Sequence, residues 1–198
     1  MKLRLLALSA LCVASSLTLG ATTDEPRADG PRYTADGKVM RPQDYREWPL
    51  IGTGLNMTYG PAGDSLGDEP PFTNVFVSPT SYKAFLQTGK WPDQTLFVLE
   101  IRSGVGVNRA NGGKNGWFQG EIQGMEIEVK DEKRFPGGWA FFGVGVGEPS
   151  GVQIPTSGSC YTCHKANAAV ENTFVQFYPV LRDVAKEKGT LKNVPEIF

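Results

Sequence analysis

The chain has 198 residues, of which 40% are hydrophobic and 21% are charged, a composition that suits one globular domain and excludes disordered and fibrous classes. Its formal net charge is −1 and no run of Lys or Arg stands out, so we expect no nucleic-acid partner. The 24 glycines and 14 prolines favour a protein of strands and turns over a helical bundle.

The N-terminal residues have the pattern of an export signal. In residues 1–20, Lys2 and Arg4 precede an apolar stretch that is too short to span a bilayer, which is typical of a secretory signal peptide. Residues 21–38 are polar and rich in turn formers, and we expect a flexible arm there, followed by a single domain at residues 39–198. We therefore expect an exported, periplasmic protein with no membrane span.

The first half of the domain predicts short strands around one helix. Its first four elements are a helix at 43–48, a strand at 49–59, a loop at 60–71 and a strand at 74–78. Ser78 and Pro79 then open a helix, and Gly89 ends it. A strongly β-prone run follows at residues 94–102.

The second half predicts a hairpin and then helices. Its elements are a glycine-rich loop or arm at 103–116, a long strand at 117–131, a strand at 137–147, a helix-like stretch at 159–172 and a helix after residue 174. No helical crossover separates the last two strands, so they should pair antiparallel. Pro179 limits how regular the last helix can be. The predicted fold class is α+β: mainly antiparallel β-sheet, a short helix between strands, and a C-terminal helical segment.

The cysteines and the histidine form one motif. Apart from Cys12 in the signal segment, every Cys and His of the chain lies within residues 160–164, where Cys160, Cys163 and His164 form a C-x-x-C-H pattern. This pattern is typical of c-type haem attachment, in which two thiols bond to the haem vinyl groups and the imidazole ligates the iron. We therefore predict one covalent haem c, with His164 as the proximal iron ligand, and the helical C-terminal segment becomes the haem-bearing part.

Three other interpretations use the same residues. A structural zinc site requires four Cys or His ligands, and the chain without its signal segment offers three. A thioredoxin-like pair normally begins a helix after a strand and does not need the adjacent His. A plain disulfide stays open as an alternative, because a C-x-x-C pair in an exported protein can oxidise.

The sixth position of the iron has few candidate ligands. The chain has one histidine and no methionine after the motif, so the remaining candidates are Met40, Met57 and Met125. Methionine is a common filler of hydrophobic cores, which is the simpler interpretation of each. The sequence therefore favours an open distal face, and a six-coordinate electron carrier stays as an alternative.

Most of the domain resembles a known family. Four segments carry the resemblance, in the same order, to the cytochrome P-460 family and its relative cytochrome c'-beta: residues 74–100, 115–135, 137–145 and 160–183. The resemblance implies an antiparallel β fold, usually dimeric, with a C-terminal c-type haem whose iron is five-coordinate on a histidine. Cys160, Cys163 and His164 match the attachment and ligand positions, and we expect a homodimer.

Four further residues match pocket positions of that family. Hydroxylamine-oxidising members carry a Lys that cross-links to the haem, and Leu99 aligns with it but cannot form the bond. Glu126 matches a distal carboxylate used in proton transfer, although it could also be one charge on a solvated strand face. Met125 and Glu126 are neighbours on a strand, so only one of them can face the iron. By resemblance, Phe76 and Phe97 line the haem pocket.

The sequence thus favours a mono-haem cytochrome that binds nitric oxide or hydroxylamine at an open iron and exchanges electrons with a small redox protein. The alternative from the same family is an enzyme that oxidises hydroxylamine or nitric oxide, with Glu126 as the proton acceptor. The second alternative is the six-coordinate electron carrier with a Met ligand.

Overall fold

A single antiparallel sheet organises the chain. The computed structural model describes residues 27–57, 69–107 and 115–192, so the expected signal segment 1–20 lies outside the described residues. The seven strands of this part are β1 (Val39–Met40), β2 (Leu50–Leu55), β3 (Phe72–Val77), β4 (Leu96–Val107), β5 (Gly116–Lys130), β6 (Trp139–Val144) and β7 (Ser150–Gln153). They lie in the order β1-β7-β6-β5-β4-β3-β2, and every neighbouring pair is antiparallel, as predicted.

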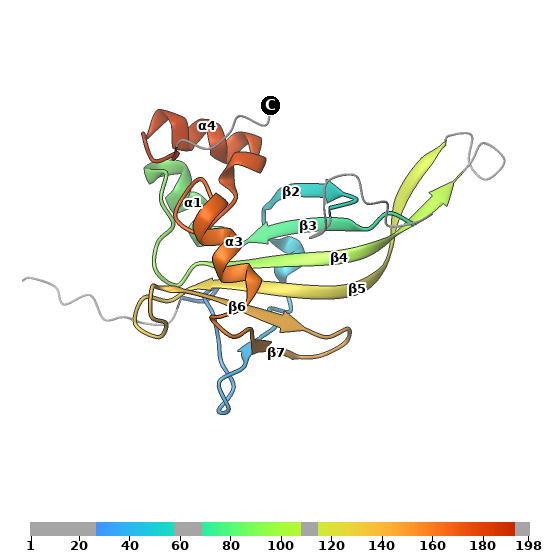
Figure 1. Cartoon of the computed structure of the whole chain (residues 1–198), viewed down its shortest axis with the longest axis horizontal. Helices are drawn as coiled ribbons and strands as arrows, with labels where there is room; N and C mark the ends of the chain where they lie inside the picture. The colour runs from blue at the N-terminus through green and yellow to red at the C-terminus, as the bar shows by residue number, and fades with distance from the viewer. Residues whose placement is uncertain (1–26, 58–68, 108–114, 193–198) are drawn as a thin grey trace, which may run out of the picture.

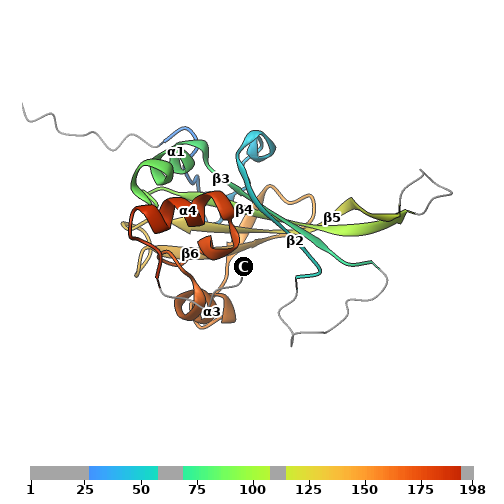
Figure 2. The same cartoon turned by 90° about the horizontal axis from the view of Figure 1, so that it is seen from above.

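Short helices gather over one part of the sheet. They are α1 (Pro79–Thr88), α3 (Ser159–Asn167) and α4 (Pro179–Glu187), with single 3-10 turns η1 (Tyr45–Glu47) and η2 (Val175–Phe177). In Figure 1 the three helices lie together, and the paired far ends of β4 and β5 extend away from them; Figure 2 shows the same arrangement from above. Within the described ranges, no helix combines the length and the apolar character that crossing a membrane requires.

Helix α1 begins and ends where the sequence predicts. Pro79 occupies its first turn, where the missing N–H costs nothing because that group has no partner inside the helix. Gly89 ends the helix with a φ of 68°, a left-handed conformation that glycine adopts without strain. Pro179 likewise stands in the first turn of α4, so the proline starts that helix instead of disturbing it.

The alternation along β5 separates two hydrophobic cores. Met125, Ile127 and Val129 point to one face, where they join a first core with Val39, Tyr45, Trp48, Leu96, Val98, Phe135, Ala140, Phe142 and Val144. The opposite face carries the helix-side core, formed by Val77, Phe85, Trp91, Phe97, Trp139, Val170, Val175, Leu181 and Ala185. Glu126, Glu128 and Lys130 of β5 therefore face the side of the sheet on which the helices lie.

Two segments are more structured than their polar and glycine-rich composition suggests. The glycine-rich segment 103–116 is not all loop, because β4 continues to Val107 and pairs with the start of β5 at Gly106 and Trp117. Within the expected flexible arm, residues 27–38 contact the rest of the domain. Arg27 Nη2 donates to Ser81 Oγ at 2.7 Å, and Tyr33 donates to Asp131 and packs edge-on against Phe135. Polar composition suggested a loose segment, but these side chains find partners distant in the sequence.

A buried carboxylate secures η1 on the first-core face of β4. Glu100 is 2% exposed, accepts hydrogen bonds from the Tyr45 hydroxyl and Arg102, and pairs with Arg46 at 2.9 Å. Burial by itself raises the pKa of Glu100, but the bonds from Arg102 and Tyr45 and the charges of Arg102 and Arg46 outweigh it and hold the pKa below its ordinary value. The ionised form is thus the one that the fold stabilises.

Replacing this carboxylate tests the network. The pKa of Glu100 is lower in the native protein than in the unfolded chain. Its contribution to the free energy of unfolding is therefore fully present above the unfolded pKa and is lost as pH falls through the native pKa. We expect Glu100→Gln to lower the free energy of unfolding by about 2 kcal/mol at pH 7, and the difference to shrink below about pH 4. Urea denaturation at both pH values measures this. A difference independent of pH would contradict the ionic role.

Candidate haem site

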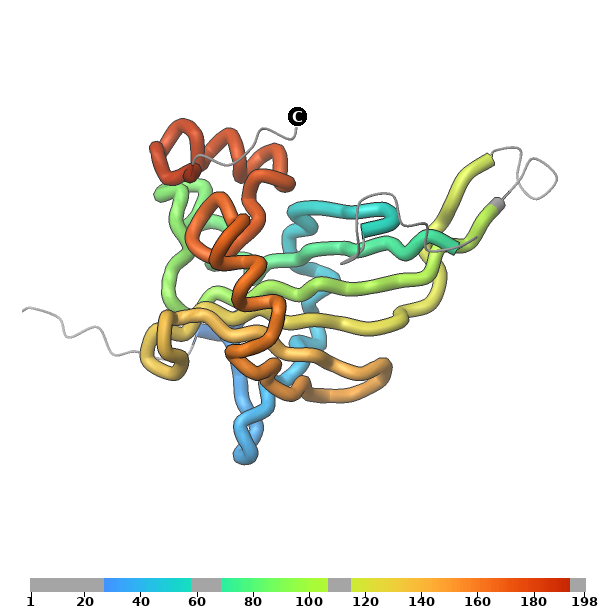
Figure 3. Tube along the Cα trace, in the orientation of Figure 1, coloured from blue at the N-terminus to red at the C-terminus, as the bar shows by residue number. Residues whose placement is uncertain are grey.

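The C-x-x-C-H motif lies on one short helix against the sheet. Cys160, Cys163 and His164 all belong to α3, and their spacings of three and four residues place them on neighbouring positions of one helix face. Cys160 is partly buried and Cys163 exposed, and the structure holds both as free thiols, not as the disulfide that was an alternative. Figure 3 shows α3 crossing over the strands of the sheet.

Aromatic contacts hold α3 on β6. The ring of Phe141 lies 4.9 Å from the Tyr161 ring and 4.5 Å from the His164 imidazole, measured between centroids. The Tyr161 hydroxyl also accepts long hydrogen bonds, both 3.4 Å, from the Phe141 backbone N–H and from Gln153 Nε2. Phe141 therefore positions two residues of the motif helix at once.

His164 is fixed in one orientation and one tautomer. Its ring lies between Phe141 and Phe174, with both centroids 4.5 Å away, and its Nδ1 donates to the backbone oxygen of Asn172 at 2.6 Å. That bond keeps the proton on Nδ1 and leaves the Nε2 lone pair free for a metal. Burial lowers the pKa of His164, partly opposed by the Asn172 carbonyl, and so favours the neutral form that ligates iron.

Leu99 and Glu126 share the sheet face of the motif helix. They are directly opposed partners on β4 and β5, and Glu126 also pairs with Gly143 on β6. The negative charge of Glu126 adds to burial in raising the pKa of the Cys160 thiol, so the carboxylate is electrostatically close to an attachment residue. Met125 is 4% exposed in the first core on the other face, so of these two neighbours Glu126 is the one on the side of the motif.

The structure separates the two aromatic candidates. Phe76 pairs with Val98 and packs edge-on against Tyr45, with ring centroids 5.4 Å apart, on the first-core face. The expectation that Phe76 lines the haem pocket is therefore wrong, because the alternation of β3 points it away from α3. Phe97 is on the motif face but lies within the helix-side core, 4% exposed, between Trp91 and Trp139.

Sequence reasoning missed a second carboxylate, Glu128. Its Oε1 lies 3.6 Å from His164 Nδ1, and this buried oxygen has no hydrogen-bond partner among the described residues. Burial first, and then the charges of Glu126 and Glu171, raise the pKa of Glu128 well above its ordinary value. The available signal was the period of two along β5, which places Glu128 on the same face as Glu126.

The residues present fit a covalently attached haem. The two thiols are free, the hydrogen bond at Nδ1 leaves the Nε2 lone pair of the imidazole available, and an unpartnered buried carboxylate oxygen lies beside the ring. Among the described residues, no group of three or more His, Cys, Asp or Glu side chains is arranged to hold a bare metal ion. Two thiols and an adjacent imidazole on one helix are the donor set of a c-type haem attachment site.

Comparison with known families agrees. The family model described as cytochrome P460 matches residues 42–175, which is more than half of the chain and includes the whole motif. The chain belongs to the cytochrome P460 family, and a haem cofactor follows from that membership. No curated protein sequence matches the chain.

Removing the attachment thiols tests the site. In a cell with the cytochrome c maturation machinery, the wild-type chain should retain one haem by mass after denaturation, because thioether bonds survive unfolding. Cys160→Ala combined with Cys163→Ala should lose it, whereas Thr162→Ala, an exposed change between the two cysteines, should keep it. Release of free haem from the denatured wild type would contradict covalent attachment.

Proposed function

We propose that this protein is an exported c-type cytochrome with one covalent haem, a five-coordinate iron on His164, and an open sixth position that binds small nitrogen species such as nitric oxide and hydroxylamine. The observation that carries the proposal is the pair Leu99 and Glu126, directly opposed on the sheet face that supports the motif helix. One is aliphatic and the other is a carboxylate, so this face offers an apolar wall and a group that can hold a proton.

Each residue has a distinct role in this proposal. Cys160 and Cys163 hold the haem, and His164 donates Nε2 from a ring that Asn172 orients. When bound, the haem supplies an iron that coordinates the nitrogen ligand. Leu99 keeps one side of the site apolar, and Glu126 accepts or returns a proton of the ligand.

Leu99 also separates this proposal from the cross-linked enzymes of the family. An aliphatic side chain has no nucleophilic nitrogen, so this position cannot bond to the haem macrocycle as the lysine of the hydroxylamine-oxidising members does. The enzyme alternative stays as the second candidate because of Glu126, whose charge acts on Cys160 and which could serve as a proton acceptor for hydroxylamine or nitric oxide oxidation.

Location and partners complete the proposal. The signal-like pattern of residues 1–20 supports export to the periplasm, where a small redox protein would exchange electrons with the haem. Resemblance to the family supports a homodimer. These parts of the proposal rest on the sequence.

Absorption spectra of the purified protein test the open iron. With no second histidine in the chain and Met125 directed into the first core, the resting ferric form should be high-spin and the ferrous form should take up nitric oxide readily. A titration with nitric oxide followed in the Soret region measures this. A low-spin spectrum with a methionine-to-iron band would overturn the proposal and favour the electron carrier.

Leu99 predicts the type of spectrum. Without the lysine bond, the ferrous protein should show an ordinary c-type spectrum without the red-shifted band of a cross-linked haem, and turnover of hydroxylamine should be slow or absent. Stopped-flow spectra and a steady-state assay with an artificial electron acceptor measure the two properties. Rapid hydroxylamine oxidation by the wild type would overturn the binder proposal.

Glu126 predicts a pH dependence. The charge of Glu126 acts on Glu128, an ionisable group two residues along the same strand face. We expect Glu126→Gln to leave haem content intact. The rate of the reaction with nitric oxide or hydroxylamine, measured as a function of pH, should change by about tenfold on one side of its pH optimum. Glu121→Gln, on an exposed position of the same strand, should have no effect. An unaltered profile in Glu126→Gln would make Glu126 a surface charge.

A further inference from the structure

The hydrogen bond to the iron ligand comes from a strained turn. Residues 170–173 form a tight turn in which Val170 and Thr173 exchange two backbone hydrogen bonds. Inside it, Glu171 has a φ of 52°, a left-handed conformation that costs energy for a residue with a Cβ, and Asn172 directs its carbonyl to His164 Nδ1. A backbone held in such a conformation needs contacts that keep it there.

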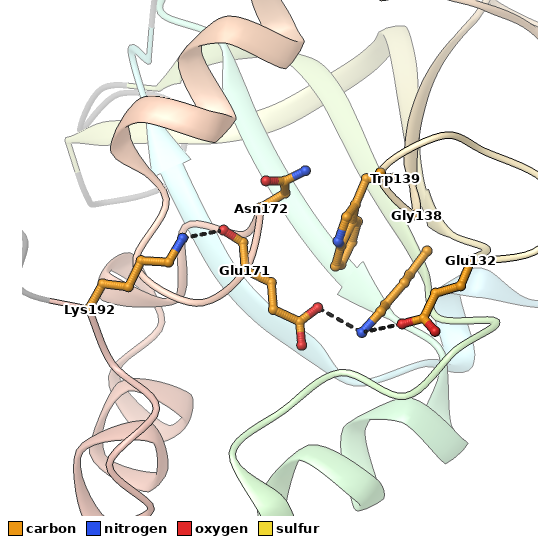
Figure 4. Close-up of a pocket in the computed structure, with 8 residues that line it drawn as sticks. Glu132, Gly138, Trp139, Glu171, Asn172 and Lys192 are labelled. Carbon is orange, nitrogen blue, oxygen red and sulfur yellow. Dashed lines mark hydrogen bonds and ion pairs between the residues drawn. The ribbon is translucent and has the colours of Figure 1, made fainter.

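Two lysines supply those contacts to Glu171. Lys130 Nζ lies 2.8 Å from Glu171 Oε2. Lys192 Nζ donates to the backbone oxygen of Glu171 at 2.9 Å (Figure 4). Lys130 is itself immobilised, because its Nζ donates to the Trp91 backbone oxygen at 2.8 Å and only 11% of its side chain is exposed. The rigid strand β5 is therefore tied to the turn through one ion pair.

The turn borders open space. A cavity of about 420 Å³ lies beside it, lined by Lys130, Glu132, Gly137, Gly138, Trp139, Glu171, Asn172 and Lys192. Packing on that side does not hold Glu171 and Asn172 in place, so the turn depends on the contacts of the two lysines, of which the Lys130 ion pair is the one made to the Glu171 side chain. If the pair is lost, the turn can relax toward a right-handed conformation and rotate the Asn172 carbonyl away from His164.

We propose that Lys130 is a positioning residue for the iron ligand: through Glu171 it holds the turn whose Asn172 carbonyl accepts the hydrogen bond of His164. This inference rests on the proposed function, because it requires His164 to ligate the haem iron. A hydrogen bond from Nδ1 to a carbonyl makes the imidazole a stronger electron donor. Weakening that bond weakens the bond from iron to histidine and favours the reduced protein.

Resonance Raman spectra of the ferrous protein with its haem attached, together with its midpoint potential, test the proposal. Glu171→Gln keeps the side-chain length and removes the charge, and Lys130→Met removes the other partner. Both should lower the iron–histidine stretching frequency and raise the midpoint potential. Lys130→Arg restores the pairing and should return both values toward those of the wild type.

The matched control is Glu132→Gln. Glu132 lies 3.3 Å from the same Lys130 nitrogen and lines the same cavity, but it is exposed and does not belong to the turn. This variant should leave the stretching frequency and the potential unchanged. An equal shift in Glu132→Gln would overturn the proposal, because any charge near Lys130 would then have the same effect.

The remaining outcomes separate the two levels of inference. A wild type without an iron–histidine band would refute the ligand assignment and with it the proposed function. The other outcome concerns a wild type that does show the band. If Glu171→Gln then leaves the band unchanged and only lowers the melting temperature, the ion pair merely stabilises the fold, and the positioning role is overturned. If Lys130→Met does not fold, the spectra and midpoint potential of Glu171→Gln alone decide whether the ion pair positions His164.

Discussion

The hydrogen bond from His164 Nδ1 to the Asn172 carbonyl decides which nitrogen of the only histidine can bind a metal. Helix α3 cannot impose this by itself, since none of its nine residues is fully buried. Its place depends on Phe141 beneath it and on the 170–173 turn beside it. A helix with so little burial would gain stability from the apolar surface of a haem, were one bonded to its two cysteines.

Strand β5 places hydrophobic residues on one face and ionisable residues under the motif helix on the other. Glu126, Glu128 and Lys130 stand at successive positions of that second face. Burying charged groups is costly unless they are paired, and Lys130 meets that cost with Glu171, whereas Glu128 has a strongly raised pKa. A strand that tolerates such groups beside a candidate iron ligand has the character of a functional site.

Local patterns predicted local features well. The helical segment that carries the C-x-x-C-H motif, the start of α1 at Pro79 and its end at Gly89 each depend on a few adjacent residues, and the structure has these elements as expected. Features that depend on register were beyond the sequence: Phe76 faces the first core because of its pairing with Val98. The roles of Glu128 and Asn172 were also missed, since a contact with His164 requires distant segments to be folded together.

The same register decides the class of chemistry that the protein can perform. A slip of one residue in β5 would turn Met125 toward the motif helix and offer the iron a sulfur ligand, as an electron carrier requires. It would also move Ile127 and Val129 out of the first core, where both are fully buried. Burial of each of these two side chains contributes about 1.5–3 kcal/mol, which the slip would forfeit. The core therefore keeps Glu126 on the face of the sheet that carries the motif helix, and keeps Met125 away from it.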